Sequence, residues 1–178
     1  VTSRESRMLY MAECRFTEPT REDAWNEWYG GRRLDELLSV PGFRTSQRFK
    51  AVTPGSSPYL AIHSIDSPDV FTSAAYRSVS GGGFQEWQQY ITDWRRNLFD
   101  GLDIAPAVAL DEYLVVTDKS SAELGAIGIS FIWLASAGLD RSVRQRGISR
   151  VDSRRAKDLT SCNRCALDIF VPLMPQKS

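Results

Sequence analysis

The chain has 178 residues, of which 42% are hydrophobic and 25% are charged, an ordinary balance for a soluble globular protein. Its 22 basic and 22 acidic residues cancel, so no net charge draws it to nucleic acid or to a membrane, and we expect neither as a partner. Three cysteines favour a reducing compartment over a disulfide framework. With no secretory signal or bilayer-length apolar run, we expect a cytoplasmic protein.

The first predicted strand covers residues 7–16, where apolar side chains alternate with mixed ones. One face is wholly apolar and consists of Met8, Tyr10, Ala12, Cys14 and Phe16; the other consists of Leu9, Met11, Glu13 and Arg15. A helix is predicted to follow from Thr20 to about Ser39. Its apolar residues form two clusters on opposite sides at 100° per residue, so we expect Gly30-Gly31 to break it.

Two further strands are predicted at 43–52, with one polar face, and at 59–65. Ser67 and Pro68 then have the pattern of a helix N-cap followed by N1. A second long helix is predicted over 84–98, where the apolar residues are spaced alternately by three and four. They are Phe84, Trp87, Ile91, Trp94 and Leu98. A strand at 109–118 completes the order β-α-β-β-α-β.

This order is typical of the ferredoxin-like sheet, whose four antiparallel strands have helices on one face only. The other face needs a cover, and a second subunit is expected to supply it. We assign this domain to residues 5–118 and a C-terminal β/α extension to 119–178. In the extension we expect strands at 126–134, 147–151 and 166–173 and a helix at 152–159. It is too short for a second full copy, and no internal repeat is evident.

Two stretches of the first domain resemble a known superfamily. They are NEWYGGRRLDELLSVPGFRTSQRFKAV and YLAIHSIDSPDVFTSAAY, which are similar to the EthD-like members of the dimeric α+β barrel proteins. There, a helix with W-Y and H-L/I-P-E-L leads to PGF and a basic strand, and a YLA strand leads to an SPEV-TS-AY helix. The resemblance implies an α+β fold whose sheet forms a dimeric barrel. It implies little about function, since the superfamily includes monooxygenases, cyclases and isomerases.

This chain departs from that pattern at two positions. Arg33 replaces the histidine of the H-L-P motif, and His63, its single histidine, replaces a tyrosine. If Leu60 and Ile62 face the helices, strand alternation turns Tyr59 and His63 into the barrel.

His63 is then expected near Glu13 and Arg48, because the first and third strands are neighbours in such a sheet. A histidine beside a carboxylate suits general acid/base catalysis, so His63 and Glu13 are the catalytic candidates. The alternative is that His63 only hydrogen-bonds across the sheet. Arg48, Tyr59 and Met11 are candidates for binding substrate.

Arg33 is a further candidate, for a substrate carboxylate, unless it is a solvated surface arginine. Cys162 and Cys165 form a C-x₂-C pair without enough further ligands for zinc, so no metal and no cofactor are expected. The segment 141–164 contains eight basic residues and two acidic ones.

Two functions fit these observations. The first is a small cofactor-independent enzyme, of isomerase, lyase, cyclase or monooxygenase type. It would act in the barrel on a compact organic acid or aromatic-derived metabolite, in aromatic catabolism. The second is a non-catalytic homodimer that binds a small molecule or a protein.

Overall fold

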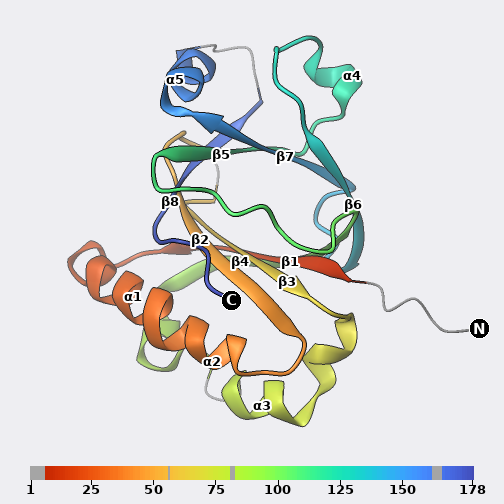
Figure 1. The fold of residues 1–178 in the computed structure, drawn as a ribbon. Helices are drawn as coiled ribbons and strands as arrows, with labels where there is room; N and C mark the ends of the chain where they lie inside the picture. The colour runs from red at the N-terminus through yellow and green to blue at the C-terminus, as the bar shows by residue number, and fades with distance from the viewer. Residues whose placement is uncertain (1–6, 56, 81–82, 162–165) are drawn as a thin grey trace, which may run out of the picture.

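Eight strands form one closed antiparallel barrel in the computed structural model, which describes residues 7–55, 57–80, 83–161 and 166–178 (Figure 1). Around the barrel the strands follow the order β1-β3-β2-β8-β5-β7-β6-β4. They are β1 (Met8–Phe16), β2 (Phe43–Ala51), β3 (Tyr59–Ile65), β4 (Ile91–Asp100), β5 (Glu112–Thr117), β6 (Ile132–Leu139), β7 (Gln145–Asp152) and β8 (Asp168–Pro172). No helix in the described ranges is long and apolar enough to cross a membrane.

The helices are short and lie outside the barrel. They are α1 (Glu22–Trp28), α2 (Leu34–Leu38), α3 (Ala74–Ser80), α4 (Ser121–Leu124) and α5 (Ser153–Ser161). Single-turn segments join or precede them: 3-10 turns η1 (Pro19–Arg21), η3 (Pro68–Thr72) and η4 (Gln85–Tyr90), and a π turn η2 (Tyr29–Arg33). The helices α1 to α3 lie on one side of the barrel, and α4 and α5 lie on the opposite side (Figure 1).

The barrel consists of two halves with the same order of elements. The first half is β1-α1/α2-β2-β3-α3-β4 and the second is β5-α4-β6-β7-α5-β8. Their strands lie in the orders β4-β1-β3-β2 and β8-β5-β7-β6, joined where β2 pairs with β8 and β4 with β6. The sequence shows no evident repeat, but the structure repeats the order of elements, and the second copy is complete because it begins at β5, before residue 119. The strand predicted at 109–118 is β5, which pairs with β7 and β8 instead of completing the first sheet.

Closure of the barrel covers the sheet face that was expected to bind a second subunit. Apolar side chains from both halves fill the interior, among them Leu9 and Met11 of β1, Phe99 of β4, Leu114 of β5 and Phe170 of β8. We expected a dimer because this sheet face needs to be covered. The second half of the same chain covers it. The homodimer, like the predicted division at residue 118, stays a prediction.

The apolar face of β1 was predicted correctly. Its alternate residues from Met8 to Phe16 pack beneath the helices of the first half, together with Trp25 and Leu34. A smaller core lies between α5 and the outer face of the second half, with Val115 and Ile169 facing Leu159. Three apolar layers therefore stabilise the fold, one inside the barrel and one beneath the helices on each side.

The predicted break at Gly30-Gly31 is a π turn, and the chain stays helical from α1 to α2. A π turn contains one extra residue, which rotates the following helix by about 100°. This rotation brings Trp25, Tyr29 and Leu37 onto one buried face. In an ideal α-helix the two apolar clusters would lie on opposite sides and could not face the same core. The extra residue of the π turn brings them to the same side.

The helix predicted over 84–98 is wrong. Residues 85–90 form the 3-10 turn η4, and β4 begins at Ile91. β4 pairs with β1 from Ile91 to Phe99. The edge of β1 that β3 leaves unpaired therefore forms hydrogen bonds with this segment, which becomes a strand. Trp94, assigned to the apolar stripe, is 37% exposed, whereas Leu98 is buried beneath the helices. Tertiary pairing here overrides a local helical pattern.

The other predictions for the C-terminal part are largely correct. β7 and α5 cover the expected strand at 147–151 and helix at 152–159, and β8 lies within the last expected strand. β6 begins later than the strand predicted at 126–134. Ser67 caps the 3-10 turn η3 as expected, accepting a hydrogen bond from the backbone N–H of Asp69 at 3.0 Å. Cys162 and Cys165 lie outside the described residues.

Candidate functional site

The pairing of β1, β3 and β2 decides which face of the sheet carries His63. Tyr10 and Ser46 lie directly opposite His63 on the two neighbouring strands, and paired residues share a face. Since Tyr10 packs beneath the helices, His63 does too, and Leu60 and Ile62 face the barrel interior. The predicted orientation of β3 is therefore wrong. Both faces of β3 are buried, so the apolar character of Leu60 and Ile62 could not decide between them.

The His63 ring is fully buried among aromatic side chains. Its Nδ1 lies 2.7 Å from the Ser46 hydroxyl, and it stacks on Tyr10 with centroids 5.1 Å apart. Its Nε2 has no hydrogen-bond partner among the described residues. Burial, and then the charges of Arg33 and Arg48, lower the pKa of His63 to about 3. The imidazole is therefore neutral near pH 7.

Glu13 lies on the opposite face of the sheet from His63, so the expected pair does not form. Its carboxylate, 5% exposed, lies 3.1 Å from Arg146 and 3.5 Å from Arg95. Arg146 also forms two hydrogen bonds with Asp118, at 2.8 and 3.0 Å. Two cations and two carboxylates thus balance at this end of the barrel, an arrangement suited to holding strands together.

Met11 belongs to the same interior and is fully buried. Its sulfur accepts a hydrogen bond from Arg146 at 3.7 Å. Met11 therefore lies among the packed side chains of the barrel, away from the helix-covered face. Arg146 was not a predicted site residue, because nothing in the sequence of the basic segment 141–164 distinguishes it from its exposed neighbours.

Arg48 is a buried cation that forms no ion pair with a carboxylate of the described residues. It is 2% exposed and lies against the rings of Tyr29 (4.1 Å), Trp25 (4.7 Å) and Tyr59 (5.5 Å). Its guanidinium donates to the backbone oxygen of Asn26 at 3.2 Å and to the side-chain oxygen of the same residue at 2.9 Å. Burial lowers the pKa of Arg48. The hydrogen-bond acceptors and rings in contact with this guanidinium are neutral among the described residues, and burial makes its charge costly.

Asn26 connects Arg48 with Tyr59, so these two predicted residues do lie together. The Asn26 amide donates to the Tyr59 hydroxyl at 3.0 Å, and that hydroxyl donates to the carboxylate of Glu22. Lys50 forms an ion pair with the same carboxylate at 3.2 Å. Burial, then the hydrogen bond with Glu22, raises the pKa of Tyr59. Asn26 and Glu22 were not predicted site residues, because the aromatic residues dominate the sequence pattern of their helix.

A pocket of about 290 Å³ lies beside Arg48. It is lined by Asn26, Glu27, Gly30, Arg48, Leu173 and Met174. The last two belong to the C-terminal segment, which follows β8 and runs beside β2 near α1 and α2 (Figure 1).

Hydrogen bonds hold this C-terminal segment in place. The backbone N–H of Leu173 donates to the carbonyl oxygen of Arg48 at 2.9 Å. Ser46 and Lys177 form two backbone hydrogen bonds with each other, each also at 2.9 Å. A side chain at Gly30 would place its Cβ 3.3 Å from the sulfur of Met174. The absence of a side chain at this position therefore leaves room for Met174 at the pocket wall.

Arg33 is 7% exposed, so it is not a solvated surface arginine. It donates to the carbonyl oxygen of Val79 at 2.7 Å, and Glu36 lies 3.7 Å away. Its Nε has no hydrogen-bond partner among the described residues. Four of the six candidates, His63, Arg48, Arg33 and Tyr59, thus share the helix-covered face. In the described ranges no three His, Cys, Asp or Glu residues are placed to bind a metal.

Solved structures share this fold at low sequence identity. An anthrone oxidase-like protein aligns with 100% of this chain and 95% of its own, at a TM-score of 0.60 and 12% identity. A monooxygenase-like protein from Lactobacillus acidophilus NCFM aligns over 96% of each chain, at a TM-score of 0.52 and 7% identity. An EthD family protein from Bacillus halodurans C-125 aligns with 50% of this chain and 95% of its own, at a TM-score of 0.39 and 12% identity.

No protein-family model and no curated protein matches the sequence. The structural likeness extends over the whole barrel in the first two of these comparisons. The predicted resemblance to the dimeric α+β barrel proteins is therefore confirmed as a likeness of fold.

Proposed function

We propose that this chain is a small cofactor-independent enzyme that binds a compact, aromatic-derived organic acid on the helix-covered face of its first half. The proposed site is the pocket beside Arg48, outside the barrel interior. The observation that carries the proposal is the Arg48 guanidinium, buried between aromatic rings and hydrogen-bonded, within the described part of the chain, to neutral oxygens of Asn26.

Physical chemistry gives a reason for an anion to bind here. Burying an unpaired cation costs several kcal/mol, and a ligand carboxylate would offset part of this cost. A guanidinium binds a carboxylate through parallel hydrogen bonds, and the neighbouring rings offer apolar contact. The pocket volume of about 290 Å³ is near the lower limit for ligand sites, which favours a substrate with a single ring.

Each proposed role is assigned to a residue on the helix-covered face of the first half. Arg48 binds the anionic group, and Asn26 orients both Arg48 and Tyr59 through its hydrogen bonds. His63 is the proposed base, because it lies on the same face of the sheet, behind the residues that line the pocket, and its Nε2 has no partner among the described residues. An anion bound near it would raise its pKa from about 3 toward neutral pH. Glu13 has no part in this proposal, because it lies on the opposite face and is neutralised by Arg146.

The proposed first step is the removal of a proton from the bound substrate. The names of two structural neighbours, an anthrone oxidase-like protein and a monooxygenase-like protein, describe oxidations. Deprotonation of a carbon acid can precede oxidation, isomerisation or the elimination of a leaving group. We therefore assign that first step to the site and propose no later one.

Arg48→Met tests the binding site. Calorimetric titration with benzoate and other single-ring acids should show binding to the wild-type protein and at least about tenfold weaker binding to the variant, from loss of a charge-assisted hydrogen-bond pair. The neutral amides of the same acids serve as the control and should not distinguish the two proteins. Equal affinity of both proteins for every acid would refute the proposal.

The second candidate function is a binding protein without catalytic activity. The low pKa of His63 favours it, since a base is most effective when its pKa is near the working pH. Incubation with each bound acid, in air and under argon, followed by mass spectrometry, separates the two functions. Conversion that disappears in His63→Gln supports the enzyme; tight binding without conversion supports the binding protein.

The likeness of the two halves bears on the oligomer. We propose that each half is a ferredoxin-like unit and that the second takes the place of a partner subunit. The repeated strand order, β4-β1-β3-β2 and β8-β5-β7-β6, supports this. On this proposal the site beside Arg48 needs residues of one chain only.

A further inference from the structure

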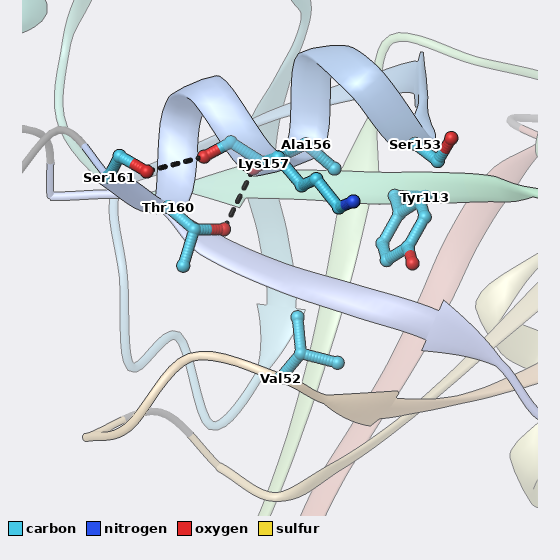
Figure 2. A pocket seen from close by; sticks show the side chains of 7 residues that line it. All are labelled: Val52, Tyr113, Ser153, Ala156, Lys157, Thr160 and Ser161. Carbon is cyan, nitrogen blue, oxygen red and sulfur yellow. Dashed lines mark hydrogen bonds between the residues drawn. The ribbon is translucent and has the colours of Figure 1, made fainter.

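A second pocket lies on the other side of the barrel, between α5 and the outer face of the second half. Its volume is about 400 Å³, within the range typical of small-molecule sites. It is lined by Val52, Tyr113, Ser153, Ala156, Lys157, Thr160 and Ser161 (Figure 2). None of these residues belongs to the site beside Arg48.

One face of α5 forms a wall of this pocket. Ser153, Ala156, Lys157 and Thr160 recur at the spacing of a single helix face. Lys157 extends from this wall toward Tyr113, and Val52 lies opposite the helix (Figure 2). Val52 is 46% exposed, so an apolar surface remains open to a ligand. The pocket thus combines one ammonium group with apolar and aromatic side chains.

The hydroxyl groups along α5 are partly used within the helix. Thr160 donates to the carbonyl oxygen of Ala156 at 2.7 Å, and Ser161 donates to that of Lys157 at 3.0 Å (Figure 2). Their protons are therefore not directed at a ligand. The strongest donor that remains at the pocket is the ammonium group of Lys157.

The charge around α5 is positive and only partly balanced. The helix contains Arg154, Arg155 and Lys157 against Asp158, and Asp152 directly before it accepts a hydrogen bond from the backbone N–H of Arg155 at 2.8 Å, which leaves one positive charge in excess. Lys157 forms no ion pair within the described part of the chain. The lysines that do are Lys50, Lys119 and Lys177. Arg155 donates to the carbonyl oxygen of Ile127, which satisfies its hydrogen bond without cancelling its charge. This part of the basic segment 141–164 therefore favours an anion.

We propose that the pocket beneath α5 is a second binding site, for a compact organic anion with an apolar face, such as a monocyclic aromatic carboxylate. The ammonium of Lys157 binds the carboxylate, and Val52, Ala156 and the ring of Tyr113 contact the apolar part. This inference is independent of the proposed function, because the two pockets share no residue and lie on opposite sides of the barrel.

The test uses benzoate with the full chain carrying Arg48→Met, which removes the other proposed site. Amide ¹H–¹⁵N spectra should show benzoate-dependent shifts at α5, Val52 and Tyr113, with a dissociation constant of about 1 mM for so small a ligand. Adding Lys157→Met should weaken binding about fivefold, the effect of one exposed ion pair. Lys119→Met is the matched control and should leave the affinity unchanged.

Three outcomes would overturn the inference: no shifts at α5 up to about 20 mM benzoate, equal affinity with and without Lys157, or equal shifts with neutral benzamide. A failure of benzoate to shift amides near Asn26 in the protein that retains Arg48 bears only on the proposed function. The two proposals therefore fail separately.

Discussion

Two buried arginines provide a direct test of the difference between a binding group and a structural one. Arg146 is 2% exposed and lies between Glu13 and Asp118. Arg146→Met removes the nearer cation of the buried Glu13 carboxylate, which keeps only the partly exposed Arg95 at 3.5 Å, and removes the ion pair with the more exposed Asp118. Breaking a buried ion pair in this way costs about 3–5 kcal/mol. Arg48 is equally buried, but among the described residues Arg48→Met leaves just the neutral oxygens of Asn26 without their donor.

The expected cost of Arg48→Met is much smaller. The variant loses contacts with three rings, each worth about 0.5–2 kcal/mol, and hydrogen bonds worth about 1.5–3 kcal/mol. It also removes a desolvation cost of several kcal/mol, and the methionine fills most of the volume. The terms nearly cancel, so we expect a change in the free energy of unfolding within about 1 kcal/mol.

Urea unfolding followed by tryptophan fluorescence measures both variants under the same conditions, and equal m-values would validate the comparison. We expect a midpoint close to that of the wild type for Arg48→Met and a large decrease for Arg146→Met. If Arg48→Met costs as much as Arg146→Met, Arg48 stabilises the fold, and the case for an anionic ligand beside it fails.

Two further predictions concern the same face. The unfolded chain protonates His63 below about pH 6.5, whereas the folded chain does so only near pH 3, so stability falls as pH decreases between these values. From pH 7 to 5 the loss is about 2 kcal/mol, and it should be absent in His63→Gln; an identical pH dependence of urea unfolding in both would contradict the low pKa. Gly30→Leu should abolish binding of single-ring acids while the protein stays folded by circular dichroism, because a side chain there meets Met174 at the pocket wall. Gly31→Leu, in the same π turn but with open space around it, is the matched control, and equal binding by the two would remove this pocket from the site.

Much of the first half could be predicted from the sequence, because its patterns were unambiguous. The alternation in β1 contains five apolar residues on one face, and this face lies beneath the helices as predicted. The phase conflict between Trp25 and Leu34 located an irregularity in the helix, which the structure shows as a π turn at the two glycines. Hydrophobic patterns of this kind depend on local geometry alone.

The errors arose where long-range pairing decided the structure. Residues 91–98 have helical spacing, yet β1 needed a partner on its second edge, and β4 supplies it. The repeat in the second half was missed because α4, with four residues, gives almost no helical signal. For His63, the two sides of β3 are equally buried, so only the register with Tyr10 and Ser46 could assign its face.

The closed barrel is also the reason why we expect a ligand to bind outside the barrel interior. In a single chain, the interior-facing residues of both halves must fill one shared space, and they do so with apolar side chains, while the loop between β4 and β5 packs Ala105 and Val108 against this core. The polar groups in the interior, such as Glu13 and Arg146, already pair with each other. The outer face of the first half differs, since it contains a buried guanidinium and an imidazole nitrogen that the described residues leave without a charged partner. Because unpaired buried polar groups cost stability, the presence of the Arg48 guanidinium beside a pocket favours a role in binding over a role in folding.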